Sequence, residues 1–173
     1  MYLIIRAEEP EDVQAIAEVI EHAFGQRTEA DLVNALRKTL NFIPELSLVA
    51  VIQGRIVGHI LFYPTPIVAS ESTRTTLTLA PLAVHPDFQN KGIGSRLVEE
   101  GLRKAKELEF DSVIVLGYPE YYRRFGFRQA STWGLKLPFE ASEDAFLAIE
   151  LKEESLKNAQ GVVHFPKEYL EGI

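Results

Sequence analysis

The chain has 173 residues, of which 46% are hydrophobic and 25% charged, and its net charge at neutral pH is −7. This is the composition of an ordinary globular protein with a full core, and the acidic excess argues against a general affinity for nucleic acid. Because the sequence has no cysteine, disulfides, thiolate metal sites and acyl transfer through an enzyme thiol are excluded.

The length suits one domain, and no repeat, low-complexity tract or linker divides the sequence. We therefore expect a single domain over residues 1–173. The chain has no transmembrane run, and Met1 to Arg6 reads as a strand that lacks the basic start and cleavage site of a signal peptide. The expected protein is cytoplasmic, with no membrane or nucleic-acid partner.

The first third of the chain predicts a strand, two helices and a β-hairpin. After the strand, Pro10 begins a helix whose apolar side chains recur on one face as far as Phe24. Thr28 is the expected N-cap of a second helix that buries apolar side chains as far as Leu40. Gln53-Gly54 predicts a tight turn between strands at 47–52 and 55–63.

The rest of the chain alternates strands and helices. Pro81 interrupts one predicted strand, and because proline cannot donate to a ladder it marks a sheet edge or a bulge. The order of the elements predicts an α/β protein with a mixed sheet. Strands are expected at 65–69, 73–84, 111–117 and 146–151, and helices at 93–105 and 119–124.

The run from Leu82 to Leu97 joins a strand to a helix through a turn that contains Gly92 and Gly94. N–H groups at a helix start lack partners within the helix, and the helix dipole adds roughly half a positive charge. A phosphate can bind there if no Cβ obstructs it. The dinucleotide fingerprint would need glycine at position 97, and the P-loop pattern has no match. The pattern that remains in this run is Gln-x-x-Gly-x-Gly. The alternative interpretation is that both glycines only form an ordinary turn.

Local charge also favours phosphate binding in this run. The chain as a whole is acidic, yet residues 89–106 have a net charge of +3. Lys91 lies inside the turn and is the better candidate for a phosphate contact, whereas Arg103, Lys104 and Lys106 fit the solvated face of an amphipathic helix equally well.

The Gln-x-x-Gly-x-Gly run resembles the acetyl-CoA pyrophosphate loop of the GNAT superfamily, the Gcn5-related N-acetyltransferases. A second run, from Leu116 to Phe127, is similar to the helix and turn after the fifth strand of GNAT enzymes, with a tyrosine followed by Arg-Phe-Gly-Phe. The resemblance covers about Leu3 to Leu151, which leaves residues 152–173 as a C-terminal extension. Its ending, Gly161 to Pro166, looks like the tail of a poorly characterised branch of predicted N-acetyltransferases.

This resemblance implies the GNAT fold, a mixed and mostly antiparallel sheet flanked by helices, in which the fourth and fifth strands splay and admit the pantetheine arm. It implies acetyl-CoA as co-substrate. The histidines show no paired metal-ligand spacing, so no metal is expected. Gln89 and Ser95 either contact phosphate or serve the turn. The residues implied to bind acetyl-CoA are Leu82, Ala83, Val84, Gln89, Asn90, Lys91, Gly92, Ile93, Gly94 and Ser95.

The resemblance further implies an N-acetyltransferase that passes acetyl directly to an amine. Counted back from Phe125-Gly126-Phe127, the functional tyrosine of the family pattern is Tyr122, expected as the general acid for the departing CoA. Adjacent helical residues point about 100° apart, so Tyr121 is expected to pack.

An alkyl ammonium with a pKa of about 10.4 must lose a proton before it can attack. Candidate bases are Glu29, Asp31 and His59. In GNAT folds the helix that Glu29 opens walls the substrate cleft, although acids there also complement the helix dipole. His59 lies on a predicted strand, where histidines more often belong to the core.

The acceptor stays open between small-molecule amines, peptide N-termini and lysine side chains, with the acidic balance favouring a cationic acceptor. A homodimer also stays open. An alternative function is that of a non-catalytic CoA-binding or regulatory module. If the chain were a purely structural domain, the presence of both motifs would be a coincidence.

Overall fold

The computed structural model describes residues 2–171, which fall into two compact units. The first unit contains the residues up to 63, residues 80–104 and the residues from 167 on; the second contains residues 64–79 and 105–166. Three elements contribute residues to both units: strands β3 (Arg55–Val68) and β4 (Thr73–Val84) and helix α3 (Ile93–Glu107).

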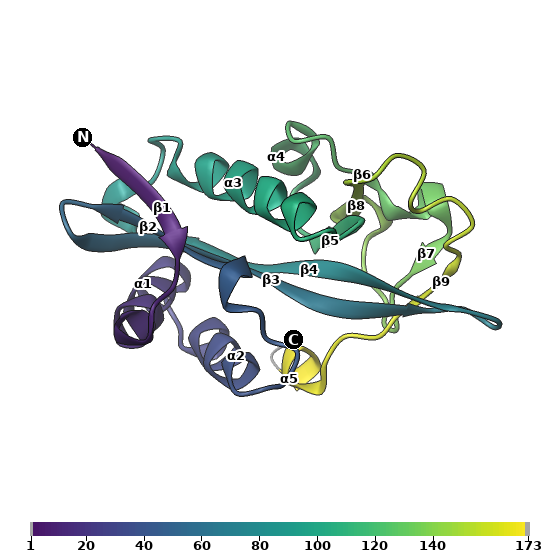
Figure 1. Cartoon of the computed structure of the whole chain (residues 1–173), viewed down its shortest axis with the longest axis horizontal. Coiled ribbons are helices and arrows are strands. Elements are labelled where there is room, and N and C mark those ends of the chain that lie inside the picture. Colours follow the sequence, from purple (N-terminus) through teal and green to yellow (C-terminus); the bar gives the residue numbers. More distant parts are fainter. Residues whose placement is uncertain (1, 172–173) are drawn as a thin grey trace. The chain divides into compact units, whose positions relative to one another are not determined.

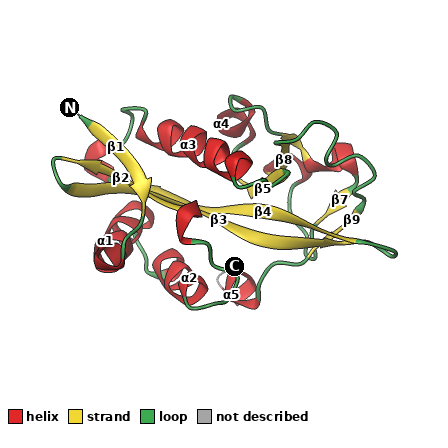
Figure 2. Cartoon of the chain, viewed as in Figure 1, coloured by secondary structure: helices red, strands yellow, loops and turns green. Residues whose placement is uncertain are grey.

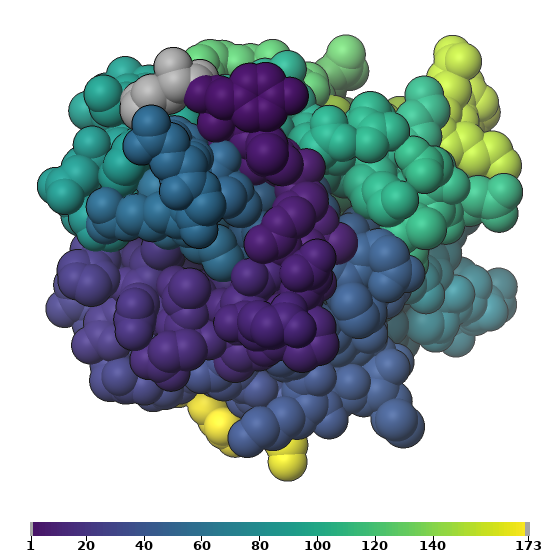
Figure 3. Space-filling model, turned by 60° about the vertical axis from the view of Figure 1, so that its left-hand side comes forward, coloured from purple at the N-terminus to yellow at the C-terminus, as the bar shows by residue number. Residues whose placement is uncertain are grey.

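The strands of the first unit follow the order β1-β2-β3-β4, with antiparallel pairing from β1 (Leu3–Ala7) to β2 (Ser47–Ile52) and from β2 to β3. The β2–β3 turn is formed by Gln53-Gly54, whose φ angles of 51° and 75° are both positive, as a type I′ hairpin turn requires. Strand β1 lies at the sheet edge, and Figure 3 shows its residues at the surface.

Helices cover both faces of the strands in the first unit. Helices α1 (Val13–Phe24) and α2 (Thr28–Arg37) lie on one face and α3 on the other (Figures 1 and 2). On the α3 face, a Cβ on Gly101 would lie 2.1 Å from Cε1 of Phe62, so the close packing of helix on sheet requires glycine there. The core on the opposite face includes Ile16, Ile20, Val33, Leu36, Val49 and Leu61.

Two expectations for α2 are wrong. Thr28 is the first helical residue and Arg27 the N-cap, so Thr28 does not cap the helix with its side chain. The helix ends at Arg37, and Leu40 is fully exposed. The Thr39 hydroxyl donates to the Leu36 carbonyl at 2.7 Å, and such a side-chain bond to a terminal carbonyl competes with a further helical turn.

The expected strands at 55–63 and 65–69 are in fact one continuous strand, β3. Pro64 and Pro66 lie within it, and the fixed φ of proline is compatible with extended backbone. Pro81 likewise does not end its strand, since β4 runs through it to Val84.

Besides its parts of β3, β4 and α3, the second unit contains β5 (Ser112–Leu116), α4 (Pro119–Arg123), β6 (Arg128–Gln129), β7 (Leu135–Lys136), β8 (Phe146–Glu150) and β9 (Gly161–Val163). Its strands follow the order β4-β5-β8-β6. Strands β4 and β5 are parallel, with Leu77 opposite Val113 and Thr78 opposite Ile114. The β5–β8 and β8–β6 pairs are antiparallel, so the predicted mixed sheet is confirmed. Strand β9 pairs with β3 and with β7.

The chain ends with helix α5 (Lys167–Glu171), which belongs to the first unit and contacts α2. No helix within residues 2–171 is long and apolar enough to span a lipid bilayer.

Candidate functional site

The turn predicted to bind phosphate is the β4–α3 loop, residues 85–92, in the first unit. Asn90 and Gly92 have φ angles of 63° and 82°, in the left-handed region that favours asparagine and glycine. The Gly92 carbonyl accepts the N–H of Arg96 at 3.1 Å, so α3 begins directly after Gly92. No atom lies within 4 Å of the position that a Cβ on Gly92 would take. Space is therefore open beside the first turn of α3, whose N–H groups have no acceptor within a helix.

Side chains brace this loop. The Gln89 side-chain amide donates to the Val84 carbonyl at 2.9 Å, and the backbone N–H of Asp87 donates to Nδ1 of His85 at 3.1 Å. The second bond caps the short 3₁₀ helix at Pro86–Phe88, so His85 shapes the turn. These two bonds restrict the conformations open to the loop.

The three strand residues expected to bind pantetheine lie at the end of β4. Ala83 is buried in the core beneath α1 and α2, and Leu82 and Val84 are half-buried. Because Gln89 bonds the Val84 carbonyl, this acceptor already has a donor in the structure.

The basic residues of the region differ in what they contact. Arg103 donates from Nε to the Glu100 carboxylate at 3.0 Å, which neutralises its charge locally. Lys91 in the loop and Arg96 in the first turn of α3 are exposed. These two side chains add positive charge close in sequence to the helix start.

Glu29 lies in the first turn of α2 and is half-buried. The side-chain amide of Gln26 donates to both of its carboxylate oxygens, at 3.0 and 3.1 Å. Asp31, the neighbouring acid, lies 3.7 Å from a guanidinium nitrogen of Arg27. Glu29 therefore contacts a neutral amide, whereas Asp31 is already paired with a cation.

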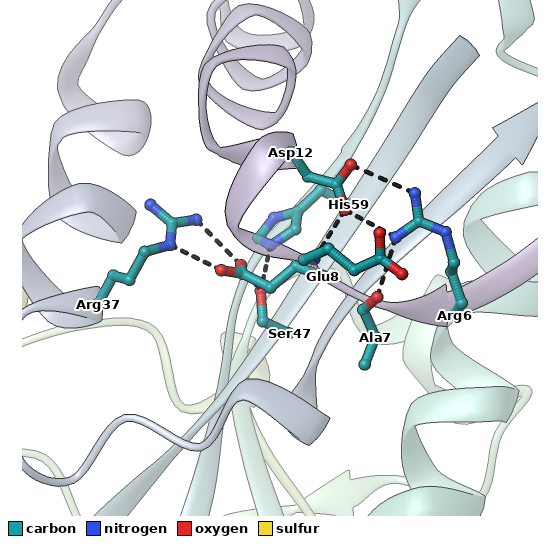
Figure 4. A network of polar contacts seen from close by, with 8 residues as sticks. Arg6, Ala7, Glu8, Asp12, Arg37, Ser47 and His59 are labelled. Carbon is teal, nitrogen blue, oxygen red and sulfur yellow. Dashed lines mark hydrogen bonds and ion pairs between the residues drawn. The ribbon is translucent and has the colours of Figure 1, made fainter. Parts of the chain in front are cut away.

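His59 belongs to a buried polar network in the first unit (Figure 4). Its Nε2 lies 2.9 Å from Oγ of Ser47, and that hydroxyl donates to the carboxylate of Glu8. Glu8 also accepts two hydrogen bonds from the Arg37 guanidinium, at 2.8 and 3.0 Å. The network therefore ties the end of β1 to β2, β3 and the last turn of α2.

Burial lowers the pKa of His59 from 6.5 to about 3, and the positive charge of Arg37 contributes. The imidazole is therefore neutral at neutral pH. Because the Ser47 hydroxyl donates to Glu8, its oxygen accepts from the His59 Nε2–H. The second ring nitrogen, Nδ1, has no hydrogen-bond partner among the described residues. This is the environment of a core histidine, and the expectation that His59 acts as a base stays a prediction.

Tyr122 lies in the second unit on α4, the helix that begins at Pro119 after β5. Its side chain is buried, and its ring meets those of Tyr121 and Phe127 edge-on at 5.1 and 5.5 Å between centroids. Tyr121 is half-buried, with the Arg124 guanidinium 4.6 Å from its ring centre. Both tyrosines therefore pack, and Tyr122 is the more enclosed of the two.

Burial, together with the neighbouring Tyr121, raises the pKa of Tyr122 above its usual value of 10.0. Its hydroxyl therefore keeps its proton throughout the neutral range. The ring occupies the space beside Gly117, where a Cβ would lie 2.5 Å from Cε2 of Tyr122. The N–H of Gly117 donates to the Ala145 carbonyl at 2.9 Å, so the glycine itself is fixed.

Neither Gly117 nor the Glu8–Arg37 pair belongs to the residues predicted from the sequence. A glycine directly after a buried strand and before a tyrosine-rich helix was the available signal for Gly117. Glu8 and Arg37 are 29 residues apart and have no such signal. Within residues 2–171, no group of three or more His, Asp or Glu side chains is placed to hold a metal ion.

Comparison with known proteins identifies the family. The sequence matches the acetyltransferase (GNAT) domain over residues 4–130. It is 38% identical over 134 residues to the uncharacterized N-acetyltransferase YjhQ of Escherichia coli, covering 77% of this chain and 74% of YjhQ. It is 31% identical over 168 residues to the uncharacterized N-acetyltransferase YhbS of the same organism, covering 96% and 98%. The chain therefore belongs to the GNAT acetyltransferase family, as the motifs predicted.

Solved structures agree with this assignment. The crystal structure of Escherichia coli YhbS in complex with CoA matches with a TM-score of 0.90 at 30% identity, covering 97% of this chain and 92% of that one. A GNAT family acetyltransferase from Brucella melitensis in complex with acetyl-CoA matches with a TM-score of 0.79 at 31% identity, covering 97% and 98%. The predicted GNAT fold class is thereby confirmed.

Proposed function

We propose that this chain is an acetyl-CoA-dependent N-acetyltransferase that transfers the acetyl group directly to an amine. The observation that carries the proposal is the β4–α3 loop, where Gly92 leaves open space beside the first turn of the 15-residue helix α3. A helix start of this kind favours a bound pyrophosphate. The CoA and acetyl-CoA complexes of the two GNAT relatives support the same ligand for this chain.

Each part of the ligand has proposed partners. The N–H groups of Ile93, Gly94 and Ser95 bind the pyrophosphate, and Lys91 offsets its negative charge. The end of β4, from Leu82 to Val84, bonds the pantetheine arm. Gln89 and Asn90 keep the loop in the conformation that exposes the helix start.

The reaction joins the amine nitrogen to the carbonyl carbon of the thioester and breaks the carbon–sulfur bond. Tyr122 is the proposed general acid, donating its hydroxyl in a hydrogen bond to the sulfur as that bond breaks. A thiol has a pKa of about 8.5, below that of Tyr122. The tyrosine therefore acts mainly by hydrogen bonding to the developing thiolate, which finally takes its proton from solvent.

The amine must also lose a proton. Glu29 is the proposed acceptor-cleft residue that attracts the ammonium group and receives its proton, directly or through water. His59 fits this role less well, because an imidazole with a pKa of about 3 cannot hold a proton at neutral pH. We assign His59 to the core network.

The proposed acceptor is a small-molecule or peptide amine, and the proposed location is cytoplasmic, since acetyl-CoA is an intracellular metabolite. The test is a panel of amines assayed for acetyl-CoA-dependent release of free CoA thiol. We expect at least one amine to accelerate release well above the amine-free rate. If acetyl-CoA binds and no amine in the panel accelerates release, the chain is instead a non-catalytic CoA-binding module.

A further inference from the structure

The segment between β6 and β8 lines an open pocket of about 700 Å³ in the second unit. Small-molecule sites usually occupy roughly 300–1,000 Å³ and have mainly apolar walls. The apolar walls here come from Leu135, Leu137, Phe139 and Phe146, of which Leu135 and Phe146 are buried. The pocket therefore has the size and the surface for the apolar body of a small ligand.

The charged residues of the pocket are mostly acidic. Glu140 and Glu143 line it together with a single basic residue, Lys136, and all three are exposed. Two carboxylates against one ammonium favour a cationic ligand. An apolar wall with an acidic rim suits a molecule with an apolar body and an ammonium group.

The walls are held by contacts outside the pocket itself. Although much of the segment is loop (Figure 2), β7 pairs in parallel with β9, with Leu135 opposite Gly161. Phe139 stacks on Phe165, with the ring centres 5.9 Å apart. A pocket braced in this way loses little conformational entropy when a ligand binds.

The pocket lies next to the backbone that supports Tyr122. Phe146 is paired with Leu116 across β5 and β8, and its neighbour Ala145 accepts the N–H of Gly117 at 2.9 Å. Gly117 is in turn the residue against which the Tyr122 ring packs. A short chain of contacts within the second unit thus joins the pocket wall to the proposed general acid.

We propose that this pocket binds the acceptor, and that the acceptor is a primary amine carried on an apolar alkyl or aryl group. The apolar group occupies the walls around Leu137 and Phe139, and the charges of Glu140 and Glu143 at the rim attract the cationic amine to the pocket. Polyamines and aminoglycosides fit poorly, because they carry several cationic groups and no apolar body. This inference rests on the proposed function and narrows its substrate class.

The experiment measures binding and turnover separately, with hexylamine and spermidine as probes. Calorimetry gives the affinity of each amine for the acetyl-CoA-free protein, and thiol release gives the KM of each. Leu137→Asn removes an apolar wall and Glu143→Gln removes a rim charge at an exposed position. Glu153→Gln, at an exposed position that does not line the pocket, is the matched control.

We expect hexylamine to bind more tightly than spermidine, and both pocket variants to weaken hexylamine about fivefold or more, as loss of roughly 1 kcal/mol implies. The control should change nothing. Weaker binding in the pocket variants supports the site even if turnover is absent, in which case only the proposed function fails. Acetylation of spermidine but not hexylamine, or an unchanged hexylamine affinity and KM in Glu143→Gln, would overturn the pocket assignment.

Discussion

Tyr122 is buried, and because burial raises the pKa of its hydroxyl, that hydroxyl stays protonated. Removing only that hydroxyl separates its chemistry from its packing. In Tyr122→Phe the aromatic cluster with Phe127 remains, so acetyl-CoA affinity and melting temperature should be nearly unchanged. The expected loss is in kcat, on the order of 10²-fold, measured by steady-state thiol release.

The control is the neighbouring tyrosine. Tyr121 is half-buried and contacts Arg124 through its ring face, so Tyr121→Phe should leave kcat within about twofold. If Tyr121→Phe lowers kcat as much as Tyr122→Phe does, the assignment of the general acid is wrong.

A substitution at Gly117 tests the role of Tyr122 in a second way, because it changes the position of the ring and does not remove its hydroxyl. A Cβ at residue 117 would lie 2.5 Å from the Tyr122 ring, so Gly117→Ala must displace the ring. A shift of about 1 Å in a reacting group can cost up to about 10²-fold in rate, and we expect a fall in kcat of at least about tenfold with acetyl-CoA affinity unchanged.

A double variant tells a positioning effect from general damage. If Gly117 acts only through Tyr122, the Gly117→Ala/Tyr122→Phe protein should be no slower than Tyr122→Phe alone. Additive losses would mean that residue 117 acts elsewhere.

At the scale of elements, the proposed phosphate binding depends on the β4–α3 loop together with the helix α3 that follows it. Gly94→Asp adds bulk and a negative charge to its first turn. An acid at a helix start favours the helix itself, so the fold should persist or gain slightly in melting temperature. Acetyl-CoA binding should fall at least about 100-fold by calorimetry, while Lys106→Ala near the other end of α3 should bind as before. Unimpaired binding by Gly94→Asp would remove the loop from the site.

The elements that the sequence predicted well are those with a strong local signal. The Gln53-Gly54 turn, the start of α3 after Gly92 and the strand at 73–84 were each found within a residue or so, because turn chemistry and apolar runs are local. Strands β6, β7 and β9 contain two or three residues each, too few for any periodicity. They exist because neighbouring strands supply the hydrogen bonds.

The residues of the candidate site also fall into those with a local sequence signal and those without one. Local motifs pointed to Gly92, Gly94 and Tyr122, whereas the packing of Tyr122 on Gly117 and the position of His59 in a buried network depend on tertiary contacts. The exposed Leu40 is a second example of what a local sequence pattern does not predict. Its place in a helical pattern predicted burial, but α2 ends three residues earlier.

At the scale of the whole molecule, the His59 network makes stability depend on pH. Above pH 6.5 the histidine is neutral in both the folded and the unfolded chain. As the pH falls from 6.5 toward about 3, the unfolded chain binds a proton that the folded chain does not. The free energy of unfolding should therefore decrease by up to about 1.4 kcal/mol per pH unit from this residue. Asp12, whose pKa the hydrogen bond from Arg6 lowers from 3.8, adds a loss in the same direction at more acidic pH.

Urea unfolding between pH 7 and pH 4 measures this slope. His59→Gln replaces the titrating ring with a neutral amide. It should reduce the slope of the free energy of unfolding against pH by the equivalent of nearly one bound proton, although it lowers stability at pH 7. The exposed His164 is the control, and His164→Gln should keep the full slope. An unchanged slope in His59→Gln would mean that His59 is protonated as easily in the folded protein as in the unfolded chain.

The most direct test of acetyl transfer to an amine is mass spectrometry of the acceptor after incubation with acetyl-CoA. With an amine that is a substrate, we expect an N-acetylated product in one-to-one ratio with free CoA, formed on the order of 10²-fold faster by the unmodified protein than by Tyr122→Phe. Release of CoA without any acetylated amine, or equal rates of product formation by the two proteins, would contradict it.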